Sequence, residues 1–254
     1  HALSGSAIHV GLMPEVLAGC SEFHEKLSEG PKGMTQEKGM IEDRKELKRL
    51  TDIVKEKMVR PRYNHVLVVK GNVLLHSLLM RVPMELESFK EQQYFILQET
   101  PKLLEAMINH CAQKNSLGPA VNCIMFSQHL VQALWLKDST LRQIPHIGEE
   151  EIKDIMNPES GAKNIVDYLK MDNDKKPGLQ RLNDIQKKDV YNVCKMLPVL
   201  NVDIKVNVED DEDAKIYSGD LITVNVIVTR ENLEEGEKRR QSTREFLKIQ
   251  KGPH

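Results

Sequence analysis

The hydrophobic pattern of this chain changes period at Pro198, and this change limits the folds that the chain can adopt. Before Pro198, apolar residues recur every three or four positions over long stretches, which predicts amphipathic helices. After it, apolar and polar residues alternate from Val199 to Val208 and again from Leu221 to Val228, which predicts two β-strands. We therefore expect a mainly α fold with a small β part.

Residues 1–137 are predicted to form a helical bundle. Ser88, with Glu91 three positions later, is the expected N-cap of a helix that Pro101 should kink or split. Aromatic residues make up only 4% of the chain, so Leu, Ile, Val and Met must build most of the core. We interpret the Met, Cys and aromatic residues of this region as core. Helical spacing runs through Leu12 to Lys26, Met40 to Met58, Val66 to Met80, Ser88 to Ile108 and Ala120 to Leu136.

Residues 138–197 are predicted to form a helix-hairpin-helix element followed by short helices. Pro145, His146 and Gly148 make the turn, and Glu149 to Glu151 open the next helix. In nucleic-acid-binding versions of this element, backbone N–H groups of the turn and helix start hold a phosphate. Three glutamates at that position would repel a phosphate at close range. This favours a structural element that joins the bundle to the strands over a hairpin that binds nucleic acid.

His146 also has two interpretations, a hydrogen-bonded turn residue or a member of a chemical site. No second histidine or carboxylate stands at a sequence spacing that predicts a metal site or an acid-base pair with it. We therefore interpret Pro145, His146 and Gly148 as a structural hairpin.

Residues 198–230 are predicted to be strands of a truncated β-sandwich. Two strands do not make a stable sheet alone, so further strands must come from sequence outside this chain or from another chain. The chain also starts at His1 without a methionine, which suggests a fragment of a longer protein. Residues 231–254 are mostly charged and polar, and we expect a disordered tail there, with an isolated helix as the alternative.

Composition and motifs exclude several function classes. The net charge of -2 gives no overall attraction to nucleic acid or anionic lipid. The sequence has no apolar run of about 18 residues, so no membrane span is predicted. The four cysteines lack C-x-x-C spacing and are interpreted as reduced thiols. Phosphate-loop, dinucleotide, zinc-protease and nucleophile-elbow motifs do not occur, so no catalytic, cofactor-binding or metal residue is predicted. These patterns favour a non-enzymatic interaction scaffold.

Several stretches resemble the C-terminal cytosolic region of the Sec sixty-three family, the J-domain translocation proteins of the endoplasmic reticulum. They are Gly71 to Leu79, Glu91 to Leu97, Asn122 to Gln128, Leu141 to Ile147, Val202 to Asp213 and Leu221 to Arg230. The resemblance implies a helical bundle, a helix-hairpin-helix element and an incomplete immunoglobulin or fibronectin type III-like β-sandwich, in that order. It also implies a parent protein of the endoplasmic reticulum membrane, with this region on the cytosolic side.

The resemblance further implies a non-enzymatic role in post-translational protein import. The implied partners are the protein-conducting channel and its accessory subunits, with no cofactor and no nucleic acid. An Hsp70-type chaperone would be recruited only through a J domain, whose His-Pro-Asp tripeptide is absent from this sequence. Acidic residues suit basic channel loops better than phosphates. We expect partner binding at Glu209, Asp210, Asp211, Glu212, Asp213, Tyr217 and Asp220.

A second resemblance gives the alternative. Trp135 to His146 resembles the accessory unit that closes the helicase cassettes of large spliceosomal RNA helicases at least as well. In that family the unit steadies a motor and touches RNA or regulatory partners. The acidic run before the second strand favours the translocation family.

Overall fold

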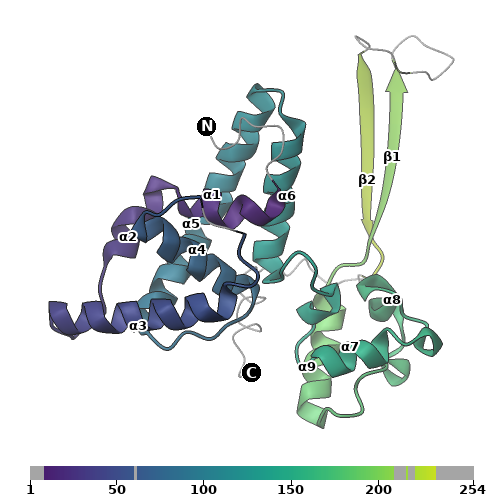
Figure 1. Cartoon of the computed structure of the whole chain (residues 1–254). Coiled ribbons are helices and arrows are strands. Elements are labelled where there is room, and N and C mark those ends of the chain that lie inside the picture. Colours follow the sequence, from purple (N-terminus) through teal and green to yellow (C-terminus); the bar gives the residue numbers. More distant parts are fainter. Residues whose placement is uncertain (1–8, 60–61, 209–215, 217–220, 233–254) are drawn as a thin grey trace. The chain divides into compact units, whose positions relative to one another are not determined.

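The computed structural model describes residues 9–59, 62–208, 216 and 221–232 (Figure 1). The chain divides between Ser139 and Thr140 into two compact units, and each is described by itself. Among the described residues, helices form most of the regular structure, and one antiparallel strand pair is the only sheet. The prediction of a mainly α fold with a small β part is confirmed.

All regular elements described in the first unit are helical. Helix α4 is its centre, because it contacts α1, α2, α3, α5 and α6. This agrees with the dense apolar sequence of α4, in which Val73, Leu74, Leu75 and Leu79 are buried. The elements are η1 (Val10–Leu12), α1 (Met13–Ala18), η2 (Ser21–Phe23), α2 (His24–Ser28), α3 (Gln36–Val54), α4 (Val66–Leu79), α5 (Glu87–Gln113) and α6 (Leu117–Gln132).

Two helix predictions in this unit are wrong in detail. The helix expected from Leu12 to Lys26 is two short helices, because the chain turns at Gly19 and Cys20 takes an extended conformation. The Ser88 cap is also wrong, since α5 begins at Glu87 with Leu86 at the N-cap.

Helix α5 begins beside a carboxylate from another helix. The Oε1 atom of Glu46 on α3 accepts a hydrogen bond from the backbone N–H of Glu85 at 2.8 Å. Further along, α5 continues as one helix through Pro101, so the proline does not split it. The Oγ1 atom of Thr100 donates to the carbonyl oxygen of Ile96 at 2.6 Å, just before that proline.

The second unit packs short helices around Tyr168, which is fully buried together with Ile155 and Val190. Side-chain caps start two of its helices: Asn164 on α8 and Asn183 on α9. The elements are η3 (Thr140–Gln143), α7 (Glu149–Ile155), η4 (Pro158–Ser160), α8 (Ile165–Lys170), η5 (Asn173–Lys175), α9 (Asp184–Met196), β1 (Leu200–Val208) and β2 (Ile222–Arg230).

Strands β1 and β2 form an antiparallel pair, with Val202 opposite Val228 and Val206 opposite Val224. This register places the apolar positions of both strands on one face of the pair. The predicted β-sandwich stays a prediction. Of the predicted tail, the structure describes only Glu231 and Asn232, which follow β2 in a turn.

Candidate partner-interaction region

The predicted partner-binding residues belong to the connection between β1 and β2. Val208 ends β1 and Ile222 begins β2. The predicted residues lie outside the described part of the chain, so their binding role stays a prediction: Glu209, Asp210, Asp211, Glu212, Asp213, Tyr217 and Asp220. What the structure does describe is how the strands on either side of this connection are held.

Asn232 and Arg230 tie the base of the strand pair to the end of α9. The side chain of Asn232 accepts from the backbone N–H of Val199 at 2.9 Å and donates to the carbonyl oxygen of Leu197 at 2.7 Å. Arg230 Nη2 donates to the carbonyl oxygen of Met196 at 3.1 Å. Because backbone groups accept or donate most of these bonds, the strands leave α9 in a fixed position.

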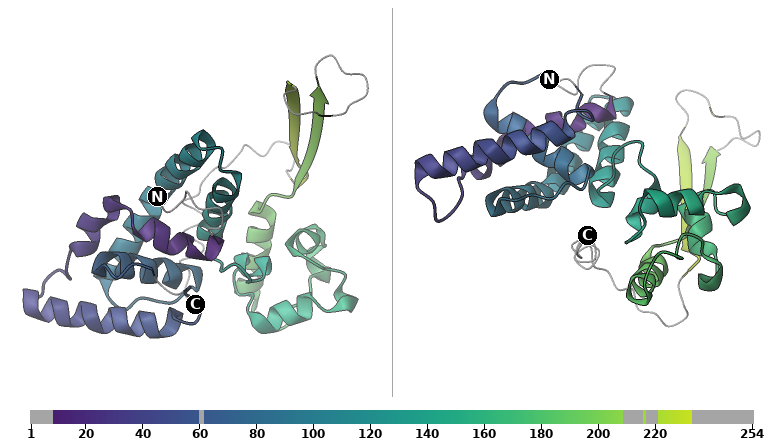
Figure 2. Two further views of the ribbon diagram at one scale, coloured as in Figure 1. Left: turned by 45° about the horizontal axis from the view of Figure 1, so that its top comes forward. Right: turned by 60° about the horizontal axis from the view of Figure 1, so that its bottom comes forward.

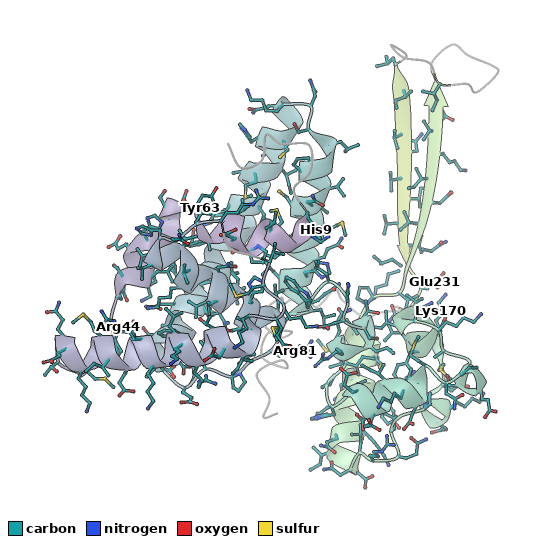
Figure 3. All side chains as sticks on the ribbon, in the orientation of Figure 1. His9, Arg44, Tyr63, Arg81, Lys170 and Glu231 are labelled. Atoms are coloured by element: carbon teal, nitrogen blue, oxygen red, sulfur yellow. The ribbon has the colours of Figure 1, made fainter. Side chains whose placement is uncertain are left out.

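A second tie joins the strand pair to α8. Lys170 Nζ lies 2.8 Å from Glu231 Oε2, and Figure 3 labels both residues at the base of the strands. Both side chains are about half exposed, so this ion pair contributes little to stability and mainly restricts orientation. The sequence did not predict these contacts of Lys170, Arg230 and Asn232, because their partners are distant in the sequence or are backbone groups.

The apolar face of the strand pair is exposed among the described residues. Its side chains are 42% to 60% exposed, although all are β-branched and apolar: Val202, Ile204, Val206, Ile222, Val224, Val226 and Val228. A two-stranded sheet with one uncovered apolar face is marginal in water. We therefore expect another layer of protein to cover this face.

The predicted structural hairpin is anchored on both sides. Ile144 and Ile147 are buried on either side of Pro145 and His146. His146 has a φ of 62°, in the left-handed region, and its Nε2 atom lies 3.0 Å from Asp189 Oδ2 on α9. His146 is thus a hydrogen-bonded residue of the turn, and its partner is the carboxylate of Asp189. Asp189 was missed because sequence spacing cannot reveal a contact between residues so far apart.

The position where a phosphate would bind at this hairpin is taken by a carboxylate of the same chain. The backbone N–H of Gly148 donates to Glu151 Oε2 at 3.0 Å, closing a capping arrangement at the start of α7. Glu149 lies 3.5 Å from Arg142, and Glu150 lies 2.7 Å from Lys153. This geometry supports the interpretation of the hairpin as a joint.

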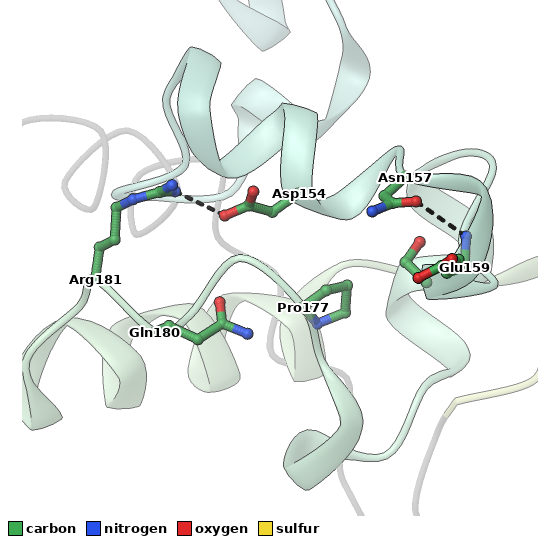
Figure 4. Close-up of a pocket in the computed structure, with 7 residues that line it drawn as sticks. Asp154, Asn157, Glu159, Pro177, Gln180 and Arg181 are labelled. Carbon is green, nitrogen blue, oxygen red and sulfur yellow. Dashed lines mark hydrogen bonds and ion pairs between the residues drawn. The ribbon is translucent and has the colours of Figure 1, made fainter.

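One open cleft of about 460 Å³ lies in the second unit, and Figure 4 draws its lining. Arg181 Nη1 contacts Asp154 Oδ2 at 2.7 Å, and Asn157 Oδ1 accepts from the backbone N–H of Glu159 at 3.1 Å. Ser160 donates to the carbonyl oxygen of Ile155. The residues that line the cleft include no histidine or cysteine.

Three ionisable side chains near α8 are buried: Tyr168, Lys176 and Cys194. Lys176 Nζ donates to the carbonyl oxygens of Tyr168 at 2.8 Å and Met171 at 2.5 Å, at the C-terminal end of α8. Burial lowers the pKa of Lys176 and raises the pKa of Tyr168. Burial also raises the pKa of the Cys194 thiol to about 11, which makes it a poor nucleophile at neutral pH.

The described residues contain no group of three or more His, Cys, Asp or Glu side chains placed to hold a metal ion. Among the helices that the structure describes, none is long and apolar enough to cross a membrane. The four cysteines, all within the described ranges, are free thiols.

Comparison with known proteins places this architecture in a family. Residues 40–250 match the Sec63 Brl domain. The chain belongs to the Sec63 Brl domain family. The family resemblance predicted from the sequence is therefore confirmed, and the shared domain explains why two protein classes matched the same stretches.

Relatives of this Sec63 Brl domain come from both classes. The chain is 31% identical to the human "Translocation protein SEC63 homolog" over 244 residues, covering 89% of this chain and 32% of that protein. It is 32% identical to the human "U5 small nuclear ribonucleoprotein 200 kDa helicase" over 187 residues, covering 73% of this chain and 8% of the helicase. A Dictyostelium discoideum relative, "Activating signal cointegrator 1 complex subunit 3-like", is 26% identical over 185 residues. The chain thus spans about a third of the translocation protein and under a tenth of the helicase.

Proposed function

We propose that this Sec63 Brl domain is a non-enzymatic docking region of a translocation component of the endoplasmic reticulum membrane. It lies on the cytosolic side, binds the protein-conducting channel and its accessory subunits, and supports post-translational import. The observation that carries the proposal is the extent of the match: the translocation relative aligns with 89% of this chain, against 73% for the helicase.

The base of the strand pair supports this role physically. Arg230 and Asn232 hold the base of the strand pair against the end of α9. At the other end of the pair, Val208 and Ile222 are strand partners, so the two residues next to the acidic connection are held together by strand pairing. A connection with fixed ends loses less conformational entropy on binding than a free tail does. Its acidic residues would attract basic channel loops and speed their association.

The exposed apolar face of the strand pair supports a larger β layer. In a fibronectin type III-like sandwich this face would pack against a second sheet about 10 Å away. The alternation on β1 and β2 and their antiparallel register suit such packing. The sandwich would then present the acidic connection at one of its ends.

The second candidate function is the accessory unit of a spliceosomal-type RNA helicase. The 32% identity to the U5 helicase favours it. The hairpin counts against RNA contact at this site, because Glu151 accepts from Gly148 and adds negative charge at the start of α7. A helicase role would then depend on protein contacts.

Two binding assays run side by side distinguish the translocation role from the helicase role. The chain is incubated with channel-containing membranes and, separately, titrated with single-stranded RNA at physiological salt. We expect retention on the membranes and no RNA binding. Replacing Asp210, Asp211 and Asp213 with Asn should weaken retention at least tenfold, because charge complementarity is lost.

A matched triple variant controls for net charge. Asp52→Asn, Glu87→Gln and Glu150→Gln remove the same number of negative charges at exposed positions of α3, α5 and α7. Retention of this variant should stay within about twofold of wild type. Salt-sensitive RNA binding without membrane retention would instead support the helicase candidate.

A further inference from the structure

Helix α6 carries a second apolar face that the other elements of its unit leave uncovered. One face packs into the bundle core through Cys123, Phe126 and Leu130. The other face is exposed to solvent. Its apolar side chains are Leu117 (77% exposed), Val121 (42%), Ile124 (45%) and Val131 (55%), with Met125 beside them (41%).

The exposed residues of α6 follow the spacing of a coiled-coil seam. Steps of four, three, four and three residues lead from Leu117 through Val121, Ile124 and Gln128 to Val131. This spacing places side chains in one narrow line along a helix, the line that a second helix covers in knobs-into-holes packing. We call these five positions the α6 seam.

The surroundings of the seam are almost free of charge. From Ala106 to Leu136 the only charged side chain is Lys114, in a chain in which 29% of residues are charged. Charged residues are depleted at the centres of protein interfaces, because burying an unpaired charge is costly. A surface helix without charge therefore fits a partner whose matching face is apolar and uncharged.

Packing within the unit leaves the seam accessible. Helix α6 packs along α5 and contacts α1 and α4. The connection between α5 and α6 lies at the upper end of the unit in Figure 1, and Figure 2 shows the same helix pair from two further directions.

We propose that the α6 seam binds one amphipathic helix of a partner protein, and that the contacting face of that helix is apolar and uncharged. The binding mode is that of a helix laid along a hydrophobic surface, with anchors at three- and four-residue steps. The proposal goes beyond the docking role above and holds whichever parent protein carries the domain.

Two other occupants of the α6 seam, a membrane surface and a second copy of this chain, fit it less well. Helices that lie on membrane surfaces carry Lys and Arg on the face opposite their apolar one, whereas α6 has neither residue and buries its opposite face in the core. A stable dimer of two copies needs about 1,200 Å² or more of buried surface. The seam offers about two heptads, which suits a transient contact better.

Peptide binding tests the proposal directly. The probes are fluorescent synthetic helical peptides about three heptads long, with Leu or Ile at the a and d positions and uncharged residues at e and g. Fluorescence anisotropy with the whole chain measures their affinities. We expect binding that changes less than twofold between low and high salt, because no ion pairs contribute.

Two double variants make the test specific. Val121→Gln with Ile124→Gln should weaken peptide binding at least tenfold, because two apolar contacts are lost. Ile41→Gln with Ile53→Gln changes two isoleucines of α3 that are 57% and 42% exposed, and should leave the affinity within twofold. All four side chains are exposed, so circular dichroism should show an unchanged helix content for both variants.

Several results would overturn the proposal. These are a peptide panel in which no member binds, equal losses in the two double variants, and affinities that depend strongly on salt. A dimer in sedimentation that only the Val121 and Ile124 variant abolishes would assign the seam to a second copy of the chain. Binding to anionic phospholipid vesicles that this variant alone loses would assign it to a lipid surface.

Discussion

Asn232 Nδ2 donates to the carbonyl oxygen of Leu197 at 2.7 Å and so joins the turn after β2 to the end of α9. The same side chain accepts through Oδ1 from the backbone N–H of Val199 and from Arg230 Nε. One amide side chain thus bonds to the start of β1, the end of β2 and the end of the preceding helix. The attachment of the strand pair to α9 depends on it.

Asn232→Ala should loosen the base of the strand pair. Losing three hydrogen bonds should cost about 1–3 kcal/mol locally. Hydrogen exchange of β1 and β2 amides should become faster, while α7 amides keep their rates. Asn201→Ala changes an exposed asparagine on β1 and should shift these rates little. Unchanged β-strand exchange in the Asn232 variant would show that this residue does not hold the base.

Alanine substitutions at two glycines with positive φ, Gly161 and Gly178, should distinguish the cost of backbone strain from the cost of a steric clash. At Gly161 (φ 81°) an added Cβ would meet no atom within 4 Å. Gly161→Ala should therefore lower the free energy of unfolding by only about 1 kcal/mol, the cost of holding alanine in the left-handed conformation. Gly178 (φ 79°) has similar strain, but an added Cβ would lie 3.0 Å from the carbonyl oxygen of Glu151 and 3.1 Å from Ile155 Cγ1.

Gly178→Ala should therefore destabilise the second unit more than Gly161→Ala does, by roughly 1–3 kcal/mol. Exchange of α7 amides reports the difference, because Glu151 and Ile155 belong to that helix. Equal effects of the two substitutions would mean that the chain relaxes around Gly178 and that the close packing there carries no energetic cost.

Burial of His76 should make the first unit sensitive to acid. The ring is 1% exposed, its Nδ1–H donates to the carbonyl oxygen of Asn72 at 2.9 Å, and it packs 5.0 Å from the Trp135 ring. Burial lowers the pKa of His76, and the negative charge of Glu15 opposes this only in part. Burial lowers the pKa of His129 as well.

Proton binding determines whether the free energy of unfolding rises or falls with pH. Below about pH 6.5, the unfolded histidine takes up a proton that the folded one resists, so the free energy of unfolding falls as pH falls through that value and below. The slope should reach at most about 1.4 kcal/mol per pH unit for each proton. Denaturant titrations followed by Trp135 fluorescence at several pH values measure it.

His76→Leu should reduce that slope, whatever it does to stability at neutral pH. Leu75→Ala is the control: this side chain is 1% exposed, so its loss should cost about 2–5 kcal/mol at every pH and leave the slope unchanged. If His76→Leu kept the full wild-type slope, another group would be responsible for the acid sensitivity.

Periodicity predicted the kind of each element, and contacts between distant residues decided the details. The alternation around Val202 and Val226 identified both strands, because a side-chain period of two is local. The helix start at Glu87 was misplaced, because the chain just before α5 is held by Glu46 on another helix. The same limit hid the contact between His146 and Asp189. The hydrogen bonds of Asn232 could not be predicted from the sequence either. Asparagine is common near turns, and two of its partners are backbone groups, which no sequence pattern marks.

Glu46 provides the last prediction, because it links α3 to the start of α5. The side chain is 4% exposed, and its carboxylate accepts from Glu85 N and from Arg49 Nε at 2.7 Å. The hydrogen bond from Arg49 lowers the pKa of Glu46. The stability it adds is therefore present above its unfolded pKa near 4.3 and is lost as pH falls through the lower folded value.

Glu46→Ala should lower the free energy of unfolding of the first unit by about 2–3 kcal/mol at pH 7, because the backbone N–H of Glu85 and the guanidinium of Arg49 lose a charged partner. Glu46→Gln keeps one acceptor and should cost less. Asp52→Asn, which disrupts an exposed ion pair with Lys55 on the same helix, should change stability by under about 1 kcal/mol. If Glu46→Ala and Asp52→Asn had equal effects, the hydrogen bond from Glu85 to Glu46 would contribute nothing to stability, and helix propensity alone would have to set where α5 begins.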